Sequence, residues 1–103
     1  MRPLDGIIVV SLEQAIAAPF CTRQLAELGA RVIKIERPGS GDESRGWGPP
    51  FDSRGESAYY VCCNRNKFSV AADCDKAEDA EFIRSLIATA DVAVDNLDRK
   101  SVV

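Results

Sequence analysis

The sequence of 103 residues contains no histidine. Within this chain a Ser–His or Cys–His pair for nucleophilic catalysis is therefore impossible, and a zinc site has no imidazole ligand. The sequence also lacks an apolar run long enough to cross a bilayer, and its first residues lack the charged head and long apolar stretch of a signal peptide. We therefore expect a cytoplasmic protein with no membrane partner.

The chain also has no excess of positive charge, since its net charge is −3. Nucleic-acid binding needs clustered cations, so we expect no nucleic-acid partner. Four cysteines are present, at positions 21, 62, 63 and 74, but no two of them have C-x-x-C spacing. We interpret them as small, partly buried thiols of a reducing compartment, and we expect no metal site and no permanently bound cofactor.

The remaining pattern is typical of alternating strands and helices. Residues 7–12 form a β-branched apolar run that predicts a buried parallel strand. The next helix has Pro19 in its first turn, Gly29 as its left-handed stop, and a predicted apolar face of Cys21, Leu25 and Leu28. Further strands are predicted at 31–36, 68–72 and 91–95, and further helices at 57–64 and 75–90.

The last predicted helix begins at Asp75, which forms a capping-box-like pair with Glu78, and its predicted buried face is Ala80, Ile83, Leu86, Ile87 and Ala90. Alternating elements of this kind predict an α/β fold with a Rossmann-like, mostly parallel open sheet and flanking helices. Four strands are fewer than such sheets usually carry, so we expect the sheet to be incomplete. The glycine- and proline-rich segment 37–55 is a long loop, and long loops are usually functional.

Parallel α/β sheets bind ligands at the carboxyl ends of their strands, so the segments after the four strands should meet at one rim. Glu36 occupies the position of a ribose-binding acid, but the first turn contains no glycine and cannot approach a pyrophosphate closely, so we do not expect NAD binding. Arg37 either binds a phosphate or is a solvated loop residue. Residues 64–67 likewise form either a phosphate-binding turn or a solvated turn before a strand. Trp47 either anchors its loop or lines a pocket.

Three stretches of the sequence resemble one family. Residues 3–7, 18–22 and 28–39 are similar to family III CoA-transferases, a family that includes formyl-CoA transferase, carnitine CoA-transferase and α-methylacyl-CoA racemase. Residues 41–42, 64–67, 69–70 and 90–92 continue the similarity in the same order. The resemblance implies that residues 1–103 are the amino-terminal part of a large CoA-binding domain, with the catalytic remainder and a small domain absent.

The resemblance further implies a function. Such enzymes move CoA between carboxylic acids through an aspartate that would lie beyond this chain, and two chains interlock as a homodimer. Coenzyme A or acyl-CoA and a carboxylic acid are then the substrates, and the loop at 47–60 resembles members that use succinyl-CoA and dicarboxylic acids. The residues expected to contact CoA are Ile16, Ala17, Arg37, Ala72, Asp73, Cys74, Asp75, Asn96, Leu97 and Asp98.

The sequence departs from the family pattern at two places. Asp75 stands where the family usually has a lysine near the CoA phosphates, which predicts weaker binding unless Lys76 substitutes. After Asn96 the sequence also differs from the family and stops, which we interpret as a truncation, a frameshift or an altered splice product. The alternatives to a transferase are an α-methylacyl-CoA racemase and a non-catalytic CoA-binding remnant.

No catalytic residue is expected within the chain itself. The acids nearest the predicted rim are Glu13, Asp42 and Asp52. We expect them to lie in a turn and in a glycine-rich loop, without the surrounding contacts that hold a reacting carboxylate in place.

Overall fold

Two β-branched runs form the centre of a parallel sheet in the computed structural model, which describes residues 1–96. Strand β1 (Ile8–Leu12) pairs with β2 (Arg31–Glu36), so that Val9 lies opposite Val32. Strand β3 (Lys67–Ala71) adds to β2, and β4 (Val92–Asp95) adds to β1. All three pairs are parallel, and the strand order is β3-β2-β1-β4. The predicted α/β open sheet is confirmed.

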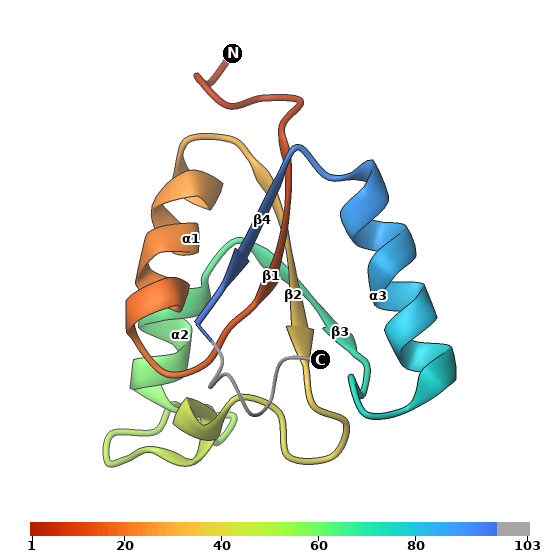
Figure 1. Cartoon of the computed structure of the whole chain (residues 1–103). Coiled ribbons are helices and arrows are strands. Elements are labelled where there is room, and N and C mark those ends of the chain that lie inside the picture. The colour runs from red at the N-terminus through yellow and green to blue at the C-terminus, as the bar shows by residue number, and fades with distance from the viewer. Residues whose placement is uncertain (97–103) are drawn as a thin grey trace.

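The helices cover the two faces of this sheet. They are α1 (Ala17–Glu27), α2 (Ala58–Asn64) and α3 (Ala77–Thr89), together with the short 3-10 helix η1 (Glu43–Gly46). Helices α1 and α2 lie on one side of the sheet and α3 lies on the other (Figure 1). The strands all point toward the lower end of Figure 1, where the loop after β2 and helix η1 also lie. Among residues 1–96, no helix is long and apolar enough to cross a membrane.

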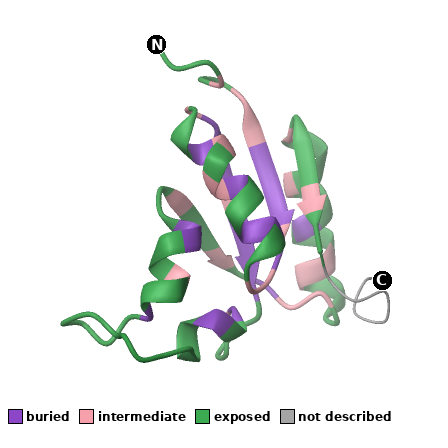
Figure 2. Ribbon diagram, turned by 90° about the vertical axis from the view of Figure 1, so that its left-hand side faces the viewer, coloured by how far each residue is buried: buried purple, intermediate pink, exposed green. Residues whose placement is uncertain are grey.

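The apolar core is divided by the sheet into two clusters. On the α1 side, Val9 and Val32 pack with Ala26 and Ala30. On the α3 side, the buried residues are Val10, Ile35, Ala72 and Ile83. Burial is concentrated in the two central strands and in the helix surfaces that face them (Figure 2). Each fully buried valine or isoleucine contributes about 1.5–3 kcal/mol, so these clusters fix the sheet and thereby the ends of its strands.

The buried face of α1 differs from the prediction. Cys21 is exposed and Leu28 is 45% exposed, whereas the buried positions are Ala18, Pro19, Thr22 and Ala26. Ala26 packs with Val9 and Val32 in the core, and the Thr22 hydroxyl donates a 2.7 Å hydrogen bond to the buried Glu13 carboxylate. Leu25 is half-buried and packs against this core, so the predicted face is right at Leu25 and wrong at Cys21 and Leu28. Gly29, at φ 110°, ends the helix as predicted.

The start of α3 also differs from the prediction. The helix begins at Ala77 after Lys76, and Asp75 caps nothing. The reason is a preceding turn at Asp73, whose carboxylate accepts from the Asp75 amide and whose own amide donates to the Asp79 carboxylate. Ile83 is buried as predicted, but Ile87 is 37% exposed.

Candidate ligand-binding site

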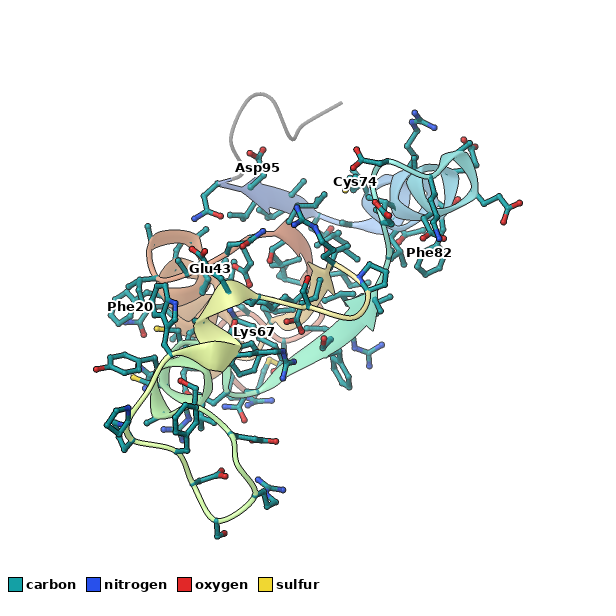
Figure 3. The ribbon with its side chains drawn as sticks, turned by 90° about the horizontal axis from the view of Figure 1, so that it is seen from below. Phe20, Glu43, Lys67, Cys74, Phe82 and Asp95 are labelled. Atoms are coloured by element: carbon teal, nitrogen blue, oxygen red, sulfur yellow. The ribbon has the colours of Figure 1, made fainter. Side chains whose placement is uncertain are left out.

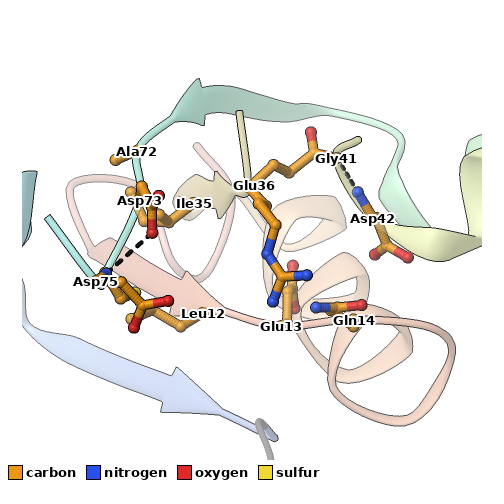
Figure 4. Close-up of a pocket in the computed structure, with 12 residues that line it drawn as sticks. Leu12, Glu13, Gln14, Ile35, Glu36, Gly41, Asp42, Ala72, Asp73 and Asp75 are labelled. Carbon is orange, nitrogen blue, oxygen red and sulfur yellow. Dashed lines mark hydrogen bonds between the residues drawn. The ribbon is translucent and has the colours of Figure 1, made fainter. Parts of the chain in front are cut away.

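The carboxyl ends of β1, β2 and β3 open onto one pocket of about 160 Å³ (Figure 4). Each strand contributes its last residue or the segment that follows it, and the loop after β2 contributes one wall. The lining residues are Leu12, Glu13, Gln14, Ile35, Glu36, Arg37, Gly41, Asp42, Ala72, Asp73, Cys74 and Asp75. The segments after β1, β2 and β3 therefore meet at one rim as predicted, whereas Asn96, which follows β4, does not line the pocket.

The predicted contact residues fall into three groups. Arg37 and the segment 72–75 line the pocket, whereas Ile16 and Ala17 are exposed at the start of α1 and do not line it. Asn96 joins the rim from β4, because its side chain accepts from the Gln14 amide and donates to the Gln14 carbonyl. Leu97 and Asp98 lie outside the described residues. The roles of all these residues toward a ligand remain predictions.

A buried ion-pair layer lies beneath the pocket, between the sheet and helices α1 and α2. The Lys34 ammonium donates to the Asp42 carboxylate at 2.6 Å and to the Asn64 side chain at 2.7 Å. The Lys67 ammonium donates to Glu13 at 2.8 Å and also contacts Asn64. The side chains of Lys34, Glu13 and Asp42 are completely buried. Since every charge has a partner, the layer supports the pocket from below without adding net charge.

The loop that forms one pocket wall is held by Glu36 at the end of β2. Its carboxylate accepts from the Arg45 guanidinium through two bonds of 2.8 Å, and from the Asp42 amide at 2.8 Å. Tyr60 of α2 and Ser69 of β3 also donate to it. Burial by itself raises the pKa of Glu36, but the hydrogen bonds from Arg45, Ser69 and the Asp42 amide outweigh it and lower the pKa to about 2. Glu36 is therefore a carboxylate that anchors the loop.

Asp42 fixes the same loop to the turn between β1 and α1. One of its oxygens accepts from the Ala15 amide at 3.1 Å and from the Ser44 amide and hydroxyl, while the other accepts from Lys34. Burial raises the pKa of Asp42, yet the hydrogen bond from Lys34 and those from the two amides together lower it. The expectation that Glu13 and Asp42 lie in unsupported turns is wrong, because both are buried and fully hydrogen-bonded.

Asp52 does not reach the rim. It is exposed, it does not line the pocket, and its carboxylate accepts from the amides of Arg54 and Glu56 within its own turn. The three acids named from the sequence therefore have structural roles in the described chain. None of them offers an oxygen that is both free of protein donors and directed at a ligand.

The segment 64–67 combines buried and surface roles. Asn64 is buried and Lys67 is largely buried in the ion-pair layer, whereas Arg65 is exposed and pairs with Glu27 at 3.2 Å. Arg65 and Asn66 form an exposed turn before β3, as the solvated-turn interpretation expects, but that interpretation does not include the buried Asn64 and Lys67. Trp47 is 37% exposed and packs edge-on against Tyr59. It does not line the pocket, which favours the loop-anchoring interpretation.

One signal for the ion-pair layer is present in the sequence, although the predictions above do not include it. With a two-residue period, Lys34 and Glu36 share the face of β2 that carries Val32, a residue with no exposure. A central parallel strand is covered on both faces, so charged residues on it must have buried partners. The partners themselves come from the loop after β2, from α2 and from β3.

Known proteins are similar in sequence to this chain over nearly its whole length. The model of "CoA-transferase family III" matches residues 4–102. A succinyl-CoA:glutarate CoA-transferase of Homo sapiens is 46% identical over 96 residues, and a succinate–glutarate CoA-transferase of Agrobacterium fabrum is 44% identical over 102. These alignments cover 93% and 94% of this chain but only 22% and 26% of the relatives. The chain thus spans about a quarter of their length.

Solved structures agree with the sequence comparison. A CAIB/BAIF family protein from Brucella suis superposes with a TM-score of 0.87 at 46% identity, covering 93% of this chain and 26% of that one. A hypothetical protein from Mycobacterium tuberculosis superposes with a TM-score of 0.80 at 36% identity, covering 90% of this chain and 25% of that one. The family match, the identity and the shared fold together establish that this chain belongs to CoA-transferase family III.

Proposed function

We propose that this chain is the CoA-binding segment of a CoA-transferase that moves CoA between carboxylic acids. The observation that carries the proposal is the pocket at the joined carboxyl ends of β1, β2 and β3, with Arg37 in its lining. Ligands of open parallel sheets bind at this end. The pocket occurs in a chain that is 46% identical to a succinyl-CoA:glutarate CoA-transferase.

Arg37 is the group best suited to bind an anionic part of CoA. It is exposed, it lines the pocket, and no hydrogen bond or ion pair occupies its guanidinium within residues 1–96. A guanidinium presents several N–H donors in a fixed plane and binds phosphate oxygens through two bonds at once. The segment 72–75 and Asn96, followed by Leu97 and Asp98, would complete the rim, with Ile16 and Ala17 reached by the extended part of the ligand.

The chemical step would take place outside this chain. The acids Glu13, Glu36 and Asp42 are occupied by protein donors, so none of them is available as a nucleophile toward a thioester. We propose that an aspartate in the remainder of a longer protein performs the transfer, and that this longer protein is a cytoplasmic homodimer. A succinyl-CoA and dicarboxylate pair is the substrate class that the two relatives' names support.

Calorimetric titration of the chain with CoA tests the binding role, with NAD as the comparison ligand. We expect saturable binding of CoA and none of NAD. The turn after β1 has no glycine, its Ala15 amide is held by Asp42, and Glu13 is buried beneath it. Saturable NAD binding together with an absence of CoA binding would overturn the proposal.

A further inference from the structure

Gly41 lines the pocket at the point where the loop after β2 crosses the ion pair of Glu36 and Arg45. Its φ is 66°, in the left-handed region that favours glycine. A Cβ added there would lie 3.0 Å from the Cδ and Nε atoms of Arg45 and from Oε1 of Glu36. Atoms in good van der Waals contact are about 3.5–4.0 Å apart, so the backbone at Gly41 rests directly on the ion pair.

The atoms beneath Gly41 are held in place by other contacts. Oε1 of Glu36 accepts from Arg45 Nε and from the Asp42 amide, each at 2.8 Å, and Figure 4 draws the second bond. The Arg45 guanidinium lies 3.9 Å from the centre of the Tyr60 ring and donates to the Tyr60 hydroxyl at 2.7 Å. That hydroxyl donates in turn to Glu36 at 3.0 Å. Since both members of the ion pair are fixed, a side chain at position 41 would displace the loop.

The next residue, Asp42, joins this contact to the rest of the pocket. Its amide is the donor to Glu36, and its carboxylate accepts from the Ala15 amide at 3.1 Å and from Lys34 at 2.6 Å. A shift of Gly41 would therefore move Asp42, and with it the turn after β1. The contact beneath Gly41 thus controls two of the segments that line the pocket.

The segment 72–75 after β3 forms the other side of the pocket. Figure 3 views the molecule from the carboxyl ends of the strands, and in it Cys74 of this segment lies apart from Glu43, the residue that follows Asp42. A ligand would enter between these two sides. Their separation depends on how closely the loop after β2 lies on the ion pair.

We propose that Gly41 is a positioning residue of the CoA pocket. Because it has no side chain, the pocket wall lies directly against Glu36 and Arg45. Arg45 and Tyr60 do not line the pocket, so they act on ligand binding through Gly41. The inference rests on the proposed CoA-binding function.

Gly41→Ala and Gly39→Ala form a matched pair of variants. Gly39 also has a positive φ, of 82°, but it does not line the pocket, and a Cβ added there would meet no atom of the described residues within 4 Å. Both substitutions therefore impose similar backbone strain, and only Gly41→Ala meets the ion pair. In calorimetric titration, Gly41→Ala should weaken CoA binding about tenfold, as the loss of a hydrogen bond to a charged group predicts, and Gly39→Ala by less than about threefold. Equal losses in the two variants would overturn the inference.

A double-mutant cycle separates the contact with Arg45 from a general loss of stability. Two of the three close atoms belong to Arg45, so they are absent in an Arg45→Ala background. Gly41→Ala should then weaken CoA binding by about threefold or less, because the two substitutions are coupled. An undiminished effect of Gly41→Ala in this background would contradict the inference.

Tyr60→Phe is a milder change that tests the same support. It keeps the ring beside Arg45 but removes the hydroxyl that contacts Arg45 and Glu36, and it should weaken CoA binding by about three- to tenfold. Tyr59→Phe is its control, because Tyr59 is exposed and its ring packs against Trp47 instead. Circular dichroism should show that the variants are folded. Equal affinities of the two tyrosine variants would overturn the inference and leave the CoA site standing, whereas a lack of CoA binding by the unaltered chain would overturn the site itself.

Discussion

The Lys34 ammonium lies 2.6 Å from the Asp42 carboxylate, and both side chains are completely buried. This ion pair joins the centre of strand β2 to the loop that forms one wall of the pocket. Because Asp42 also accepts from the Ala15 amide, one carboxylate holds β2, the turn after β1 and the start of η1 together. The shape of the pocket therefore depends on a charge pair whose two members are occupied by each other and by neighbouring protein groups.

Replacing Lys34 by methionine should strongly destabilise the chain. The change leaves Asp42 buried without its cation, and the loss of one partner of a buried pair costs about 3–5 kcal/mol. Urea denaturation of the unaltered and variant chains measures the difference. Lys76→Met is the control, because a substitution at an exposed site should stay within about 0.5 kcal/mol. A Lys34→Met variant as stable as this control would show that the pair does not support the fold.

The folded chain should lose stability in acid through Glu36. Its pKa is lowered from 4.5 to about 2 in the folded state, so the carboxylate contributes stability above pH 4.5. That contribution, on the order of 3 kcal/mol, is lost as the pH falls from 4.5 toward 2. Glu36→Gln should be less stable than the unaltered chain at pH 7, and the difference should shrink through this window.

Urea denaturation at a series of pH values measures the effect of Glu36. Glu81→Gln provides the control, because Glu81 is an exposed acid of α3 whose surface pair with Arg84 contributes about 0–1 kcal/mol. Parallel pH profiles for the Glu36→Gln variant and the unaltered chain would contradict the anchoring role of Glu36.

The order of strands and helices could be predicted from the sequence, because the apolar runs of β1 and β2 and the end of α1 at Gly29 are local signals. The parallel order of the strands was sufficient to predict that Arg37 and the segment 72–75 share one rim, and both line the pocket. The support of the pocket could not be predicted in the same way. Lys34 and Asp42 lie eight residues apart, and only the folded loop brings them into contact.

The faces of α1 show a second limit. A helical period alone does not show that Ala18, Thr22 and Ala26 are buried while Cys21 and Leu28 are exposed. Ala26 is buried against Val9 and Val32, and Thr22 is buried where its hydroxyl donates to Glu13. That choice depends on a polar partner in a different element, which a periodic pattern does not contain.

The chain by itself should not transfer CoA. Its rim acids are either buried among protein donors or, like Asp75, held in a surface turn beside Asp73. Incubation with succinyl-CoA and a labelled dicarboxylic acid should therefore give no labelled acyl-CoA above the blank without protein. Product that disappears when an acid within residues 1–103 is replaced would place the catalytic carboxylate in this chain.

The central claim is that CoA binds at the carboxyl rim through Arg37, and calorimetric titration of an Arg37→Ala variant tests it most directly. Arg54→Ala is the matched control, because Arg54 is also exposed but does not line the pocket. Loss of a charge-assisted hydrogen bond should weaken CoA binding by about 1.5–3 kcal/mol, roughly 10- to 150-fold, in Arg37→Ala alone. An unchanged affinity for CoA in Arg37→Ala, or an equal loss in Arg54→Ala, would contradict the account.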